Sequence, residues 1–304
     1  MKNKKLQLTH KKRERNALNC FVFVFLVLFT LSLFILLTWG LFASLKSPAE
    51  FRLNKLGIPK GHIWEWSWSN YSFVYQNFVM DVTNQSKQTI EVGVSNMIIN
   101  SLLYCIGCAF IGTLVPCIVA YLVVKFPFRF GKIIISVVLI TMMLPIVGAT
   151  ASEIYVLNKL NLFDSFIGVW IQKFNFLGLY FLIFVANYEL ISDAYIEAAY
   201  IDGAGEFRIM TRIILPMVKP TFFTIFLLQV ISYWNDYQTV LLYLPSHPTL
   251  SLGLYELSRS TINGLNNVPM RMAGVFIVAL PVFILFAIFN NRFMGNLSMG
   301  GVKE

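Results

Sequence analysis

Side chains that carry out chemistry are scarce in this sequence. Its 304 residues include only three histidines, and these are far apart: His10 in a basic N-terminal tail, and His62 and His247 in polar segments. A membrane-embedded enzyme needs His, Asp, Glu, Cys or Ser side chains clustered near an interface. The spacing of these residues predicts no catalytic group, so a membrane enzyme is the less favoured class of function.

The cysteines also lack the partners that metal or redox chemistry would require. All four lie in apolar segments: Cys20, Cys105, Cys108 and Cys117. Cys105 and Cys108 have C-x-x-C spacing, but no second pair and no histidine is nearby. We interpret them as small buried apolar residues. The sequence also has no G-x-x-x-x-G-K-[ST] phosphate loop, so we predict no metal or cofactor in this chain and no ATP hydrolysis by it.

The sequence WNDY (234–237) places two polar residues, Asn235 and Asp236, within an otherwise apolar run. An ionisable side chain within a membrane span costs a few kcal/mol at the midplane, so Asp236 should face a wet pathway or a partner. Trp234 and Tyr237 lie beside it and offer aromatic rings for stacking. The candidates for such a pathway are Gln229, Trp234, Asn235, Asp236 and Tyr237. The alternative for Asp236 is a structural role in holding its helix.

The segment from Glu197 to Pro220 is polar, helix-forming and punctuated by glycines, and it separates two apolar runs. Ser192 or Asp193 can cap a short helix that continues to Asp202, and Gly203 can end it because glycine tolerates left-handed backbone angles. One face of that helix carries Tyr195, Ala198, Ala199 and Asp202, where the adjacent alanines would form a smooth patch.

A second short helix is predicted from Glu206 to Ile214. It would place Phe207, Met210 and Ile214 on one side and Arg208 and Arg212 on the other. Pro216 and Pro220 are expected to end it before the next apolar run. The segment from Glu197 to Pro220 is either a structured site for another protein or an amphipathic loop in the lipid headgroup region.

Composition indicates a polytopic membrane protein. The chain is 57% hydrophobic and only 13% charged, with a mean hydropathy of +0.67. Its net charge of +9 does not indicate nucleic-acid binding, because the basic residues flank apolar runs rather than form one stripe. Spans need about 20 apolar residues. We predict an all-α fold with six transmembrane helices: 16–45, 92–124, 133–152, 165–188, 220–243 and 272–291.

An even number of spans places both termini on one side. The segments on that side would carry 15 of the 24 Lys and Arg residues, so the positive-inside rule predicts cytoplasmic termini in a cell membrane. The predicted organisation is a basic tail (1–17), a six-helix domain (18–295) with a cytoplasmic loop (189–219) between spans four and five, and a C-terminal tail (296–304). The aromatic-rich outer loop (46–91) is either an interfacial belt or a docking surface.

The polar segment resembles the EAA loop of ATP-binding-cassette (ABC) importer permeases. That pattern reads Glu-Ala-Ala, two residues, Asp-Gly-Ala, then about a dozen residues to Leu-Pro. The matching residues are Glu197, Ala198, Ala199, Asp202, Gly203, Ala204, Leu215 and Pro216. The resemblance implies that these residues, with Phe207, couple the membrane domain to an ATPase. One departure is Met210, where the family usually carries Phe.

Outside this loop the chain resembles the carbohydrate-uptake branch, and in particular the smaller permease subunit of maltose-type transporters. The similar stretches include FRLNKLGIP, WSNY, NSLLY, TMMLP, WNDYQTVLLYL and HPTLSLGLY. The family often has proline in the fourth helix where this chain reads NFLGLYF. The resemblance implies a sugar or oligosaccharide importer, with glycerol phosphate or a polyol as the alternative cargo.

The resemblance also implies the partners. These are a second permease, two cytoplasmic ATPases that bind ATP and Mg²⁺, and an external sugar-binding protein. ATP would close the ATPase dimer, drag the helix from Ala194 to Asp202 inward and open the spans outward. The C-terminal tail, with Gly300, Gly301 and Lys303, would reach between the ATPases. The alternative is a disordered end whose Lys303 only reinforces orientation.

Overall fold

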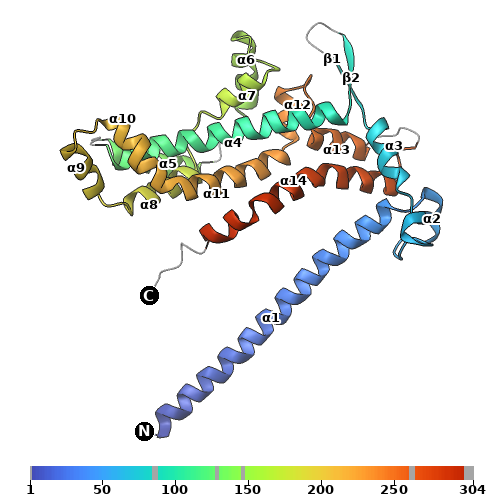
Figure 1. Ribbon diagram of the computed structural model, residues 1–304, viewed down its shortest axis with the longest axis horizontal. Helices are drawn as coiled ribbons and strands as arrows, with labels where there is room; N and C mark the ends of the chain where they lie inside the picture. Colours follow the sequence, from blue (N-terminus) through green and yellow to red (C-terminus); the bar gives the residue numbers. More distant parts are fainter. Residues whose placement is uncertain (1, 84–87, 127–129, 145–147, 260–263, 298–304) are drawn as a thin grey trace. The chain divides into compact units, whose positions relative to one another are not determined.

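The computed structural model describes residues 2–83, 88–126, 130–144, 148–259 and 264–297. It consists of helices and one β-hairpin, so the predicted helical fold is confirmed in its main part and the two strands are an addition (Figure 1). The chain divides into two compact units. The first comprises residues 1–75 and 260–277, and the second comprises residues 76–259 and 278–304.

The first unit contains the longest helix, α1 (Lys2–Ser44), of which Leu18–Ser44 is long and apolar enough to cross a membrane. The helix continues into the basic tail, further than the sequence predicts. Three short helices follow it: α2 (Pro48–Leu53), η1 (Ile63–Glu65) and α3 (Ser69–Asn77). Lys46 holds the loop around α2, since its Nζ donates to the carbonyls of Asn54 (2.7 Å) and Gly57 (2.6 Å).

The second unit begins with the hairpin of β1 (Met80–Thr83) and β2 (Thr89–Val92), which pair antiparallel with Met80 opposite Val92. The helices that follow in order are α4 (Val94–Val124), α5 (Gly131–Met143), α6 (Thr150–Lys159), α7 (Phe166–Gln172), α8 (Leu179–Glu189), α9 (Ala194–Ile201), α10 (Glu206–Ile209), η2 (Met210–Ile214), α11 (Leu215–Trp234), α12 (Gln238–Tyr243) and α13 (Leu250–Arg259). Helix α14 (Val268–Leu297) contributes residues to both units.

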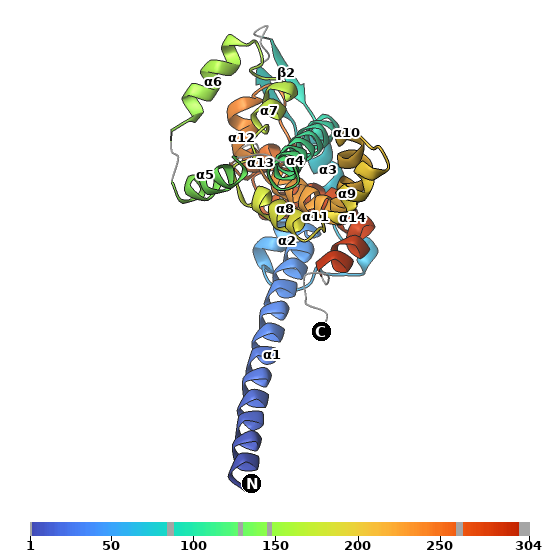
Figure 2. The same cartoon turned by 90° about the vertical axis from the view of Figure 1, so that its left-hand side faces the viewer.

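Helix α4 organises the second unit, because α7, α8, α11 and α13 all pack against it. Figures 1 and 2 show α11 and α8 running alongside it. The main buried cluster joins α4, α8 and α11 to the short helices between α8 and α11, and its largest side chains include Tyr188, Phe181 and Phe184. Its small residues, including Ala109, Cys117 and Ala120, are fully buried, so neighbouring helices approach it closely.

Within the described residues, four helices are long and apolar enough to cross a membrane: Leu18–Ser44, Val94–Val124, Glu206–Trp234 and Val268–Ile288. A fifth is obtained if α8 and α9, which are bent by 67°, count as one span. The predicted third span corresponds to α5, of only 13 residues, and part of α6, with residues 145–147 outside the described chain. The predicted fourth span is interrupted between α7 and α8.

The start of the fifth span differs most from the prediction. Pro216 and Pro220 do not end a helix, because α10, η2 and α11 form one continuous helix from Glu206 to Trp234. A proline inside an α-helix removes one hydrogen bond and clashes with the carbonyl four residues earlier. The π-turn of η2 immediately precedes Pro216 and widens the helix there, which accommodates the ring.

Candidate functional site

Helix α9 ends at Gly203 in the way that the sequence predicts. Gly203 has a φ of +75°, in the left-handed region. Two hydrogen bonds close the helix end, from the Ala204 amide to the Ala199 carbonyl (2.9 Å) and from the Gly203 amide to the Tyr200 carbonyl (3.0 Å). This pair is the Schellman motif, which fixes the direction in which the chain leaves a helix. The Asp-Gly-Ala part of the motif therefore has a defined backbone shape.

The start of α9 is attached to the end of α4 by a charged side chain. Lys125 Nζ lies 2.6 Å from Asp193 Oδ1 and also donates to the Ile191 carbonyl at 2.6 Å. The Lys125 side chain is only 4% exposed, whereas that of Asp193 is 72% exposed. Asp193 occupies the capping position without capping through its side chain, and Ser192 Oγ accepts from the Ala194 amide at 3.3 Å.

The segment from α9 to η2 is anchored in the main buried cluster. Ile196 and Ala199 of α9 enter it, as do Ile209 of α10 and Ile214 of η2. Leu215 packs against the same cluster, and Pro216 is exposed. These contacts place the segment on the same core as α4 and α8.

Two predicted faces of this segment are wrong in detail. Ala199 is buried while Ala198 is exposed, because neighbouring residues of a helix point about 100° apart and only one can face the core. The alanines therefore do not form one shared patch. Likewise Phe207 is exposed while Ile214 is buried, since the π-turn between them changes the helical rotation.

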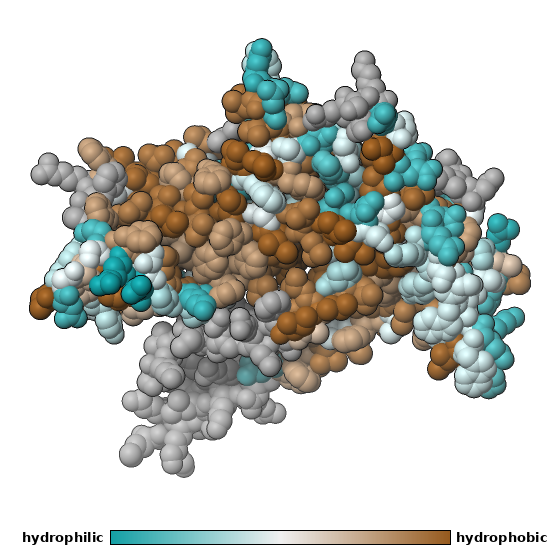
Figure 3. Space-filling view, turned by 45° about the horizontal axis from the view of Figure 1, so that its top comes forward, coloured by the Kyte–Doolittle hydropathy of each residue, from teal (hydrophilic) through white to brown (hydrophobic). Residues whose placement is uncertain are grey.

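The exposed side of the segment combines acidic and apolar side chains. Glu197 and Asp202 are exposed, and no other side chain in the described chain pairs with either carboxylate. Ile201 is 86% exposed and Phe207 is 74% exposed. In Figure 3, hydrophilic colour gathers at the end that carries α9 and α10, beside the hydrophobic surface of the longer helices. Tyr200 donates a hydrogen bond to Glu206, which links the two sides of the glycine turn.

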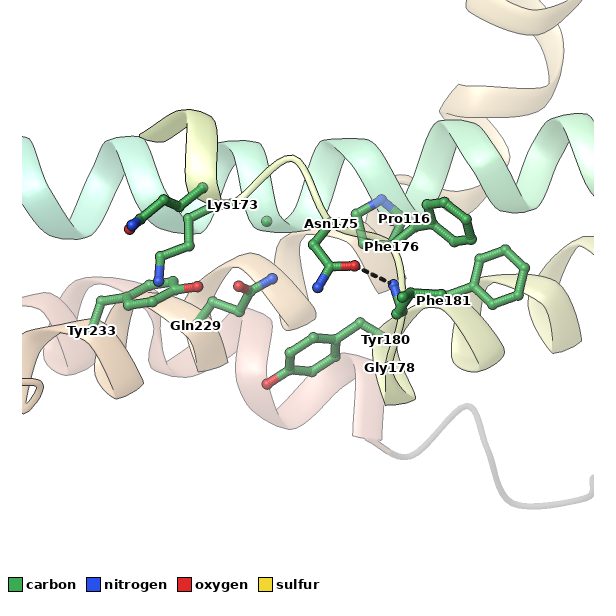
Figure 4. Close-up of a pocket in the computed structure, with 12 residues that line it drawn as sticks. Pro116, Lys173, Asn175, Phe176, Gly178, Tyr180, Phe181, Gln229 and Tyr233 are labelled. Atoms are coloured by element: carbon green, nitrogen blue, oxygen red, sulfur yellow. Dashed lines mark hydrogen bonds between the residues drawn. The ribbon is translucent and has the colours of Figure 1, made fainter. Parts of the chain in front are cut away.

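A second candidate site is a pocket of about 310 Å³ beside the break between α7 and α8. Figure 4 shows side chains of three segments converging on it. Helix α4 contributes Gly112 and Pro116, and α11 contributes Gln229 and Tyr233. The interrupted segment contributes the rest: Gln172, Lys173, Asn175, Phe176, Leu177, Gly178, Tyr180 and Phe181. Irregular backbone at membrane depth occurs where it is buried in protein or lines a water-filled cavity.

Of the five predicted pathway residues, only Gln229 lines this pocket. Its Nε2 donates to Thr113 Oγ1 at 2.9 Å, and its Oε1 would lie 2.5 Å from a Cβ at Gly112. Trp234 is buried and donates to the Val278 carbonyl at 3.2 Å.

The other three pathway candidates lie at or after the end of α11. Asn235 is exposed and donates to the Ile231 carbonyl, and the Tyr237 ring stacks on Tyr255 with centroids 4.5 Å apart. Asp236 follows α11 instead of lying inside it, and accepts from Tyr104 Oη (2.8 Å) and the Thr239 amide (3.0 Å). These bonds favour the structural alternative for Asp236.

Sequence analysis did not identify Lys173, Asn175, Tyr180 and Tyr233 as pocket residues. The Nζ of Lys173 lies 5.2 Å from the centroid of the Tyr233 ring. The available signal was the stretch KFNFLG (173–178), which combines a lysine, an amide and a glycine in an otherwise apolar run. Gly300, Gly301 and Lys303 lie outside the described residues.

Comparison with known proteins agrees with this architecture. Residues 112–298 match the model of the family "binding-protein-dependent transport system inner membrane component". That range covers more than half of the chain, so the protein belongs to this family of membrane permeases. The resemblance inferred from the EAA loop is confirmed.

Individual relatives are permeases of sugar and phosphate-ester transporters. The arabinooligosaccharide permease AraQ of Bacillus subtilis is 31% identical over 61% of this chain, which spans 65% of that relative's length. The diacetylchitobiose uptake permease NgcG of Streptomyces coelicolor is 21% identical over 90% of this chain and 86% of its own. The sn-glycerol-3-phosphate permease UgpE of Yersinia enterocolitica is 28% identical over 73% of this chain and 75% of its own.

A solved structure shares the fold. It belongs to a bacterial ABC transporter involved in the import of the acidic polysaccharide alginate, and the TM-score is 0.66. The likeness covers 89% of this chain and 94% of the other, with 22% sequence identity.

Proposed function

We propose that this chain is a transmembrane permease subunit of an ATP-driven, binding-protein-dependent importer of sugars or oligosaccharides. The observation that carries the proposal is the anchored segment from α9 to η2 in a member of this permease family. Its buried side chains join the core of the membrane helices, and its exposed side presents unpaired carboxylates and apolar groups to a partner. A displacement of α9 would therefore move α4 and α8 with it.

The partners would be a second permease, two cytoplasmic ATPases that hold ATP and Mg²⁺, and an external sugar-binding protein. We infer six spans, counting α5 with α6 as the third and α7 with α8 as the fourth. Both termini and α9 would face the cytoplasm, as the distribution of Lys and Arg favours. Glu197 would meet a basic group of the ATPase, and the cycle would be alternating access.

Two classes of cargo are considered: oligosaccharides and glycerol phosphate. The relationship to UgpE favours glycerol phosphate as a second candidate, while the relationships to AraQ and NgcG favour oligosaccharides. Uptake of radiolabelled sugars and glycerol 3-phosphate by cells with and without this chain distinguishes the two. A deletion that alters the uptake of neither would contradict the proposed function.

Charge reversal at the exposed carboxylate tests the coupling role. Glu197→Lys should leave the chain in the membrane but prevent co-purification of the ATPase and abolish uptake. Glu189→Lys is the matched control, because Glu189 is also an exposed acid but lies at the end of α8, before α9 begins. Wild-type uptake by Glu197→Lys, or equal loss in both variants, would reject a specific role for Glu197.

A further inference from the structure

The pocket at the break between α7 and α8 lies near the middle of the membrane helices. Trp170 of α7 fills the space next to Gly107, where an added Cβ would be 2.1 Å from the indole Nε1. Gly107 lies 13 residues after the start of α4 and 17 before its end. At 1.5 Å per residue these separations are about 20 Å and about 26 Å. Lys173, three residues after Trp170, is therefore placed deep between the ends of α4.

Lys173 has no acidic partner at this depth. Among the residues that the structure describes, no carboxylate lies within 4.0 Å of its Nζ. The carboxylate of Glu153, which lines an adjoining pocket with Lys173, accepts from Tyr243 Oη at 2.5 Å. Asp236 is occupied by Tyr104 and the Thr239 amide. A charged side chain inside a membrane protein ordinarily pairs with an opposite charge or lines a substrate pathway. Because Lys173 has no carboxylate partner among the described residues, we assign it to a pathway.

Two amide side chains beside Lys173 can donate hydrogen bonds, whereas Gln229, whose Nε2 donates to Thr113, keeps only its Oε1 acceptor free. Gln172 Nε2 is buried, and within the described part of the chain it makes no hydrogen bond of regular geometry, although its amide lies close to the Tyr243 hydroxyl. The Oδ1 of Asn175 accepts a hydrogen bond from the Leu177 amide (2.8 Å). The NH₂ group of Asn175 therefore remains available to donate to a ligand. Among the described residues that line the pocket there is no Asp or Glu, and the rings of Tyr180 and Tyr233 border it (Figure 4). One cation, two amide donors and two aromatic rings suit a sugar ring that carries an oxyanion.

We propose that this pocket binds the cargo as it crosses the membrane, and that the cargo is a saccharide bearing a carboxylate or a phosphate, whose oxyanion contacts Lys173. The inference rests on the proposed importer function and deepens it by naming the substrate class. The pocket volume of about 310 Å³ is at the lower end of the range for ligand sites, which suits one or two sugar rings at a time.

The test measures uptake by cells that express the complete transporter, with paired radiolabelled probes. The probes are a neutral glucose disaccharide, the corresponding disaccharide with a glucuronate ring, and a glucose phosphate. Wild type should favour a charged probe over the neutral one, and which charged probe is taken up distinguishes carboxylate from phosphate. Lys173→Met should lower uptake of the charged probe about 10- to 100-fold, the loss expected for a charge-assisted hydrogen bond. Lys173→Arg should retain most of it.

Lys159→Met is the matched control, because Lys159 is exposed on α6 and its Nζ also lies over a tyrosine ring, that of Tyr155 at 5.6 Å. It should match wild type. Membrane content of each variant separates a transport defect from misfolding. The inference is overturned if wild type prefers the neutral sugar, or if Lys173→Met keeps the charged-to-neutral uptake ratio of wild type. Uptake of the neutral probe alone by wild type would overturn this inference and leave the importer proposal standing, whereas the uptake comparison with and without this chain tests the importer proposal itself.

Discussion

Substitution of Gly203 gives the sharpest test of the proposed coupling role of the segment from α9 to η2. Its φ of +75° is strained for residues with a side chain, and no atom lies within 4 Å of a Cβ built there. The penalty for a larger residue is therefore one of backbone conformation and not of crowding. A left-handed conformation costs an L-residue roughly 1–2 kcal/mol, and more for a β-branched one. That energy changes the ratio of native to altered helix ends by roughly 5- to 30-fold.

A graded series separates this backbone effect from other causes. Asparagine tolerates the left-handed region better than alanine, and valine tolerates it least, so coupling should fall in the order Gly, Asn, Ala, Val. Gly205→Val is the matched control. Gly205 is also exposed with nothing within 4 Å of its Cβ, but its φ of −78° and ψ of 161° suit valine.

The assay is the ratio of sugar imported to ATP hydrolysed by the complete transporter in proteoliposomes, with ATPase activity stimulated by loaded binding protein. Gly203→Val should reach the membrane in normal amount and lower this ratio at least fivefold, while Gly205→Val stays near wild type. Wild-type coupling in Gly203→Val would refute the reasoning. Equal loss in both valine variants would show that surface bulk, and not the helix end, is responsible.

Three further predictions concern topology, the link between α4 and α9, and the C-terminal tail. A membrane-impermeant thiol reagent should label a cysteine placed at Trp66 in intact cells and spare one at Gly205; labelling of Gly205 from outside would overturn the topology. Lys125→Met removes the bonds to Asp193 and the Ile191 carbonyl, so uptake should fall several-fold with normal membrane content, whereas Lys132→Met serves as control and should not change it. Deletion of residues 300–304 should preserve assembly and alter ATPase stimulation by loaded binding protein, and unchanged stimulation would identify a passive end.

Local signals in the sequence predicted the long helices and the end of α9. The apolar run of α4 and the glycine stop at Gly203 depend on neighbours in the chain, and both are present in the structure. The prediction was wrong where distant contacts decide the outcome. A proline such as Pro216 normally ends a helix. Here the helix continues past it, because the preceding π-turn is packed into the core and accommodates the proline ring.

The pocket was harder to predict because its side chains come from three separate segments. Lys173, Gly112 and Tyr233 are distant in the sequence and share a site only because α7 and α11 both pack on α4. The sequence predicts that Asp236 is an acid near a membrane span. It does not predict that Tyr104 and the Thr239 amide donate hydrogen bonds to this carboxylate, because Tyr104 is distant in the chain. Buried polar residues can be located from sequence, but the partners that satisfy them cannot.

The short helices between α4 and α9 also bear on how the chain enters a bilayer. Helices α5, α7 and α8 have 13, 7 and 11 residues, each short of the roughly 20 apolar residues that a segment needs to insert unaided. Helix α4 has 31 residues and is synthesised before them. Because Trp170 fits against Gly107 of α4, the later segments would gain their place by docking on a helix that precedes them in synthesis. The helix on which the shorter helices depend is therefore synthesised first, and α4 would serve as the surface on which they assemble.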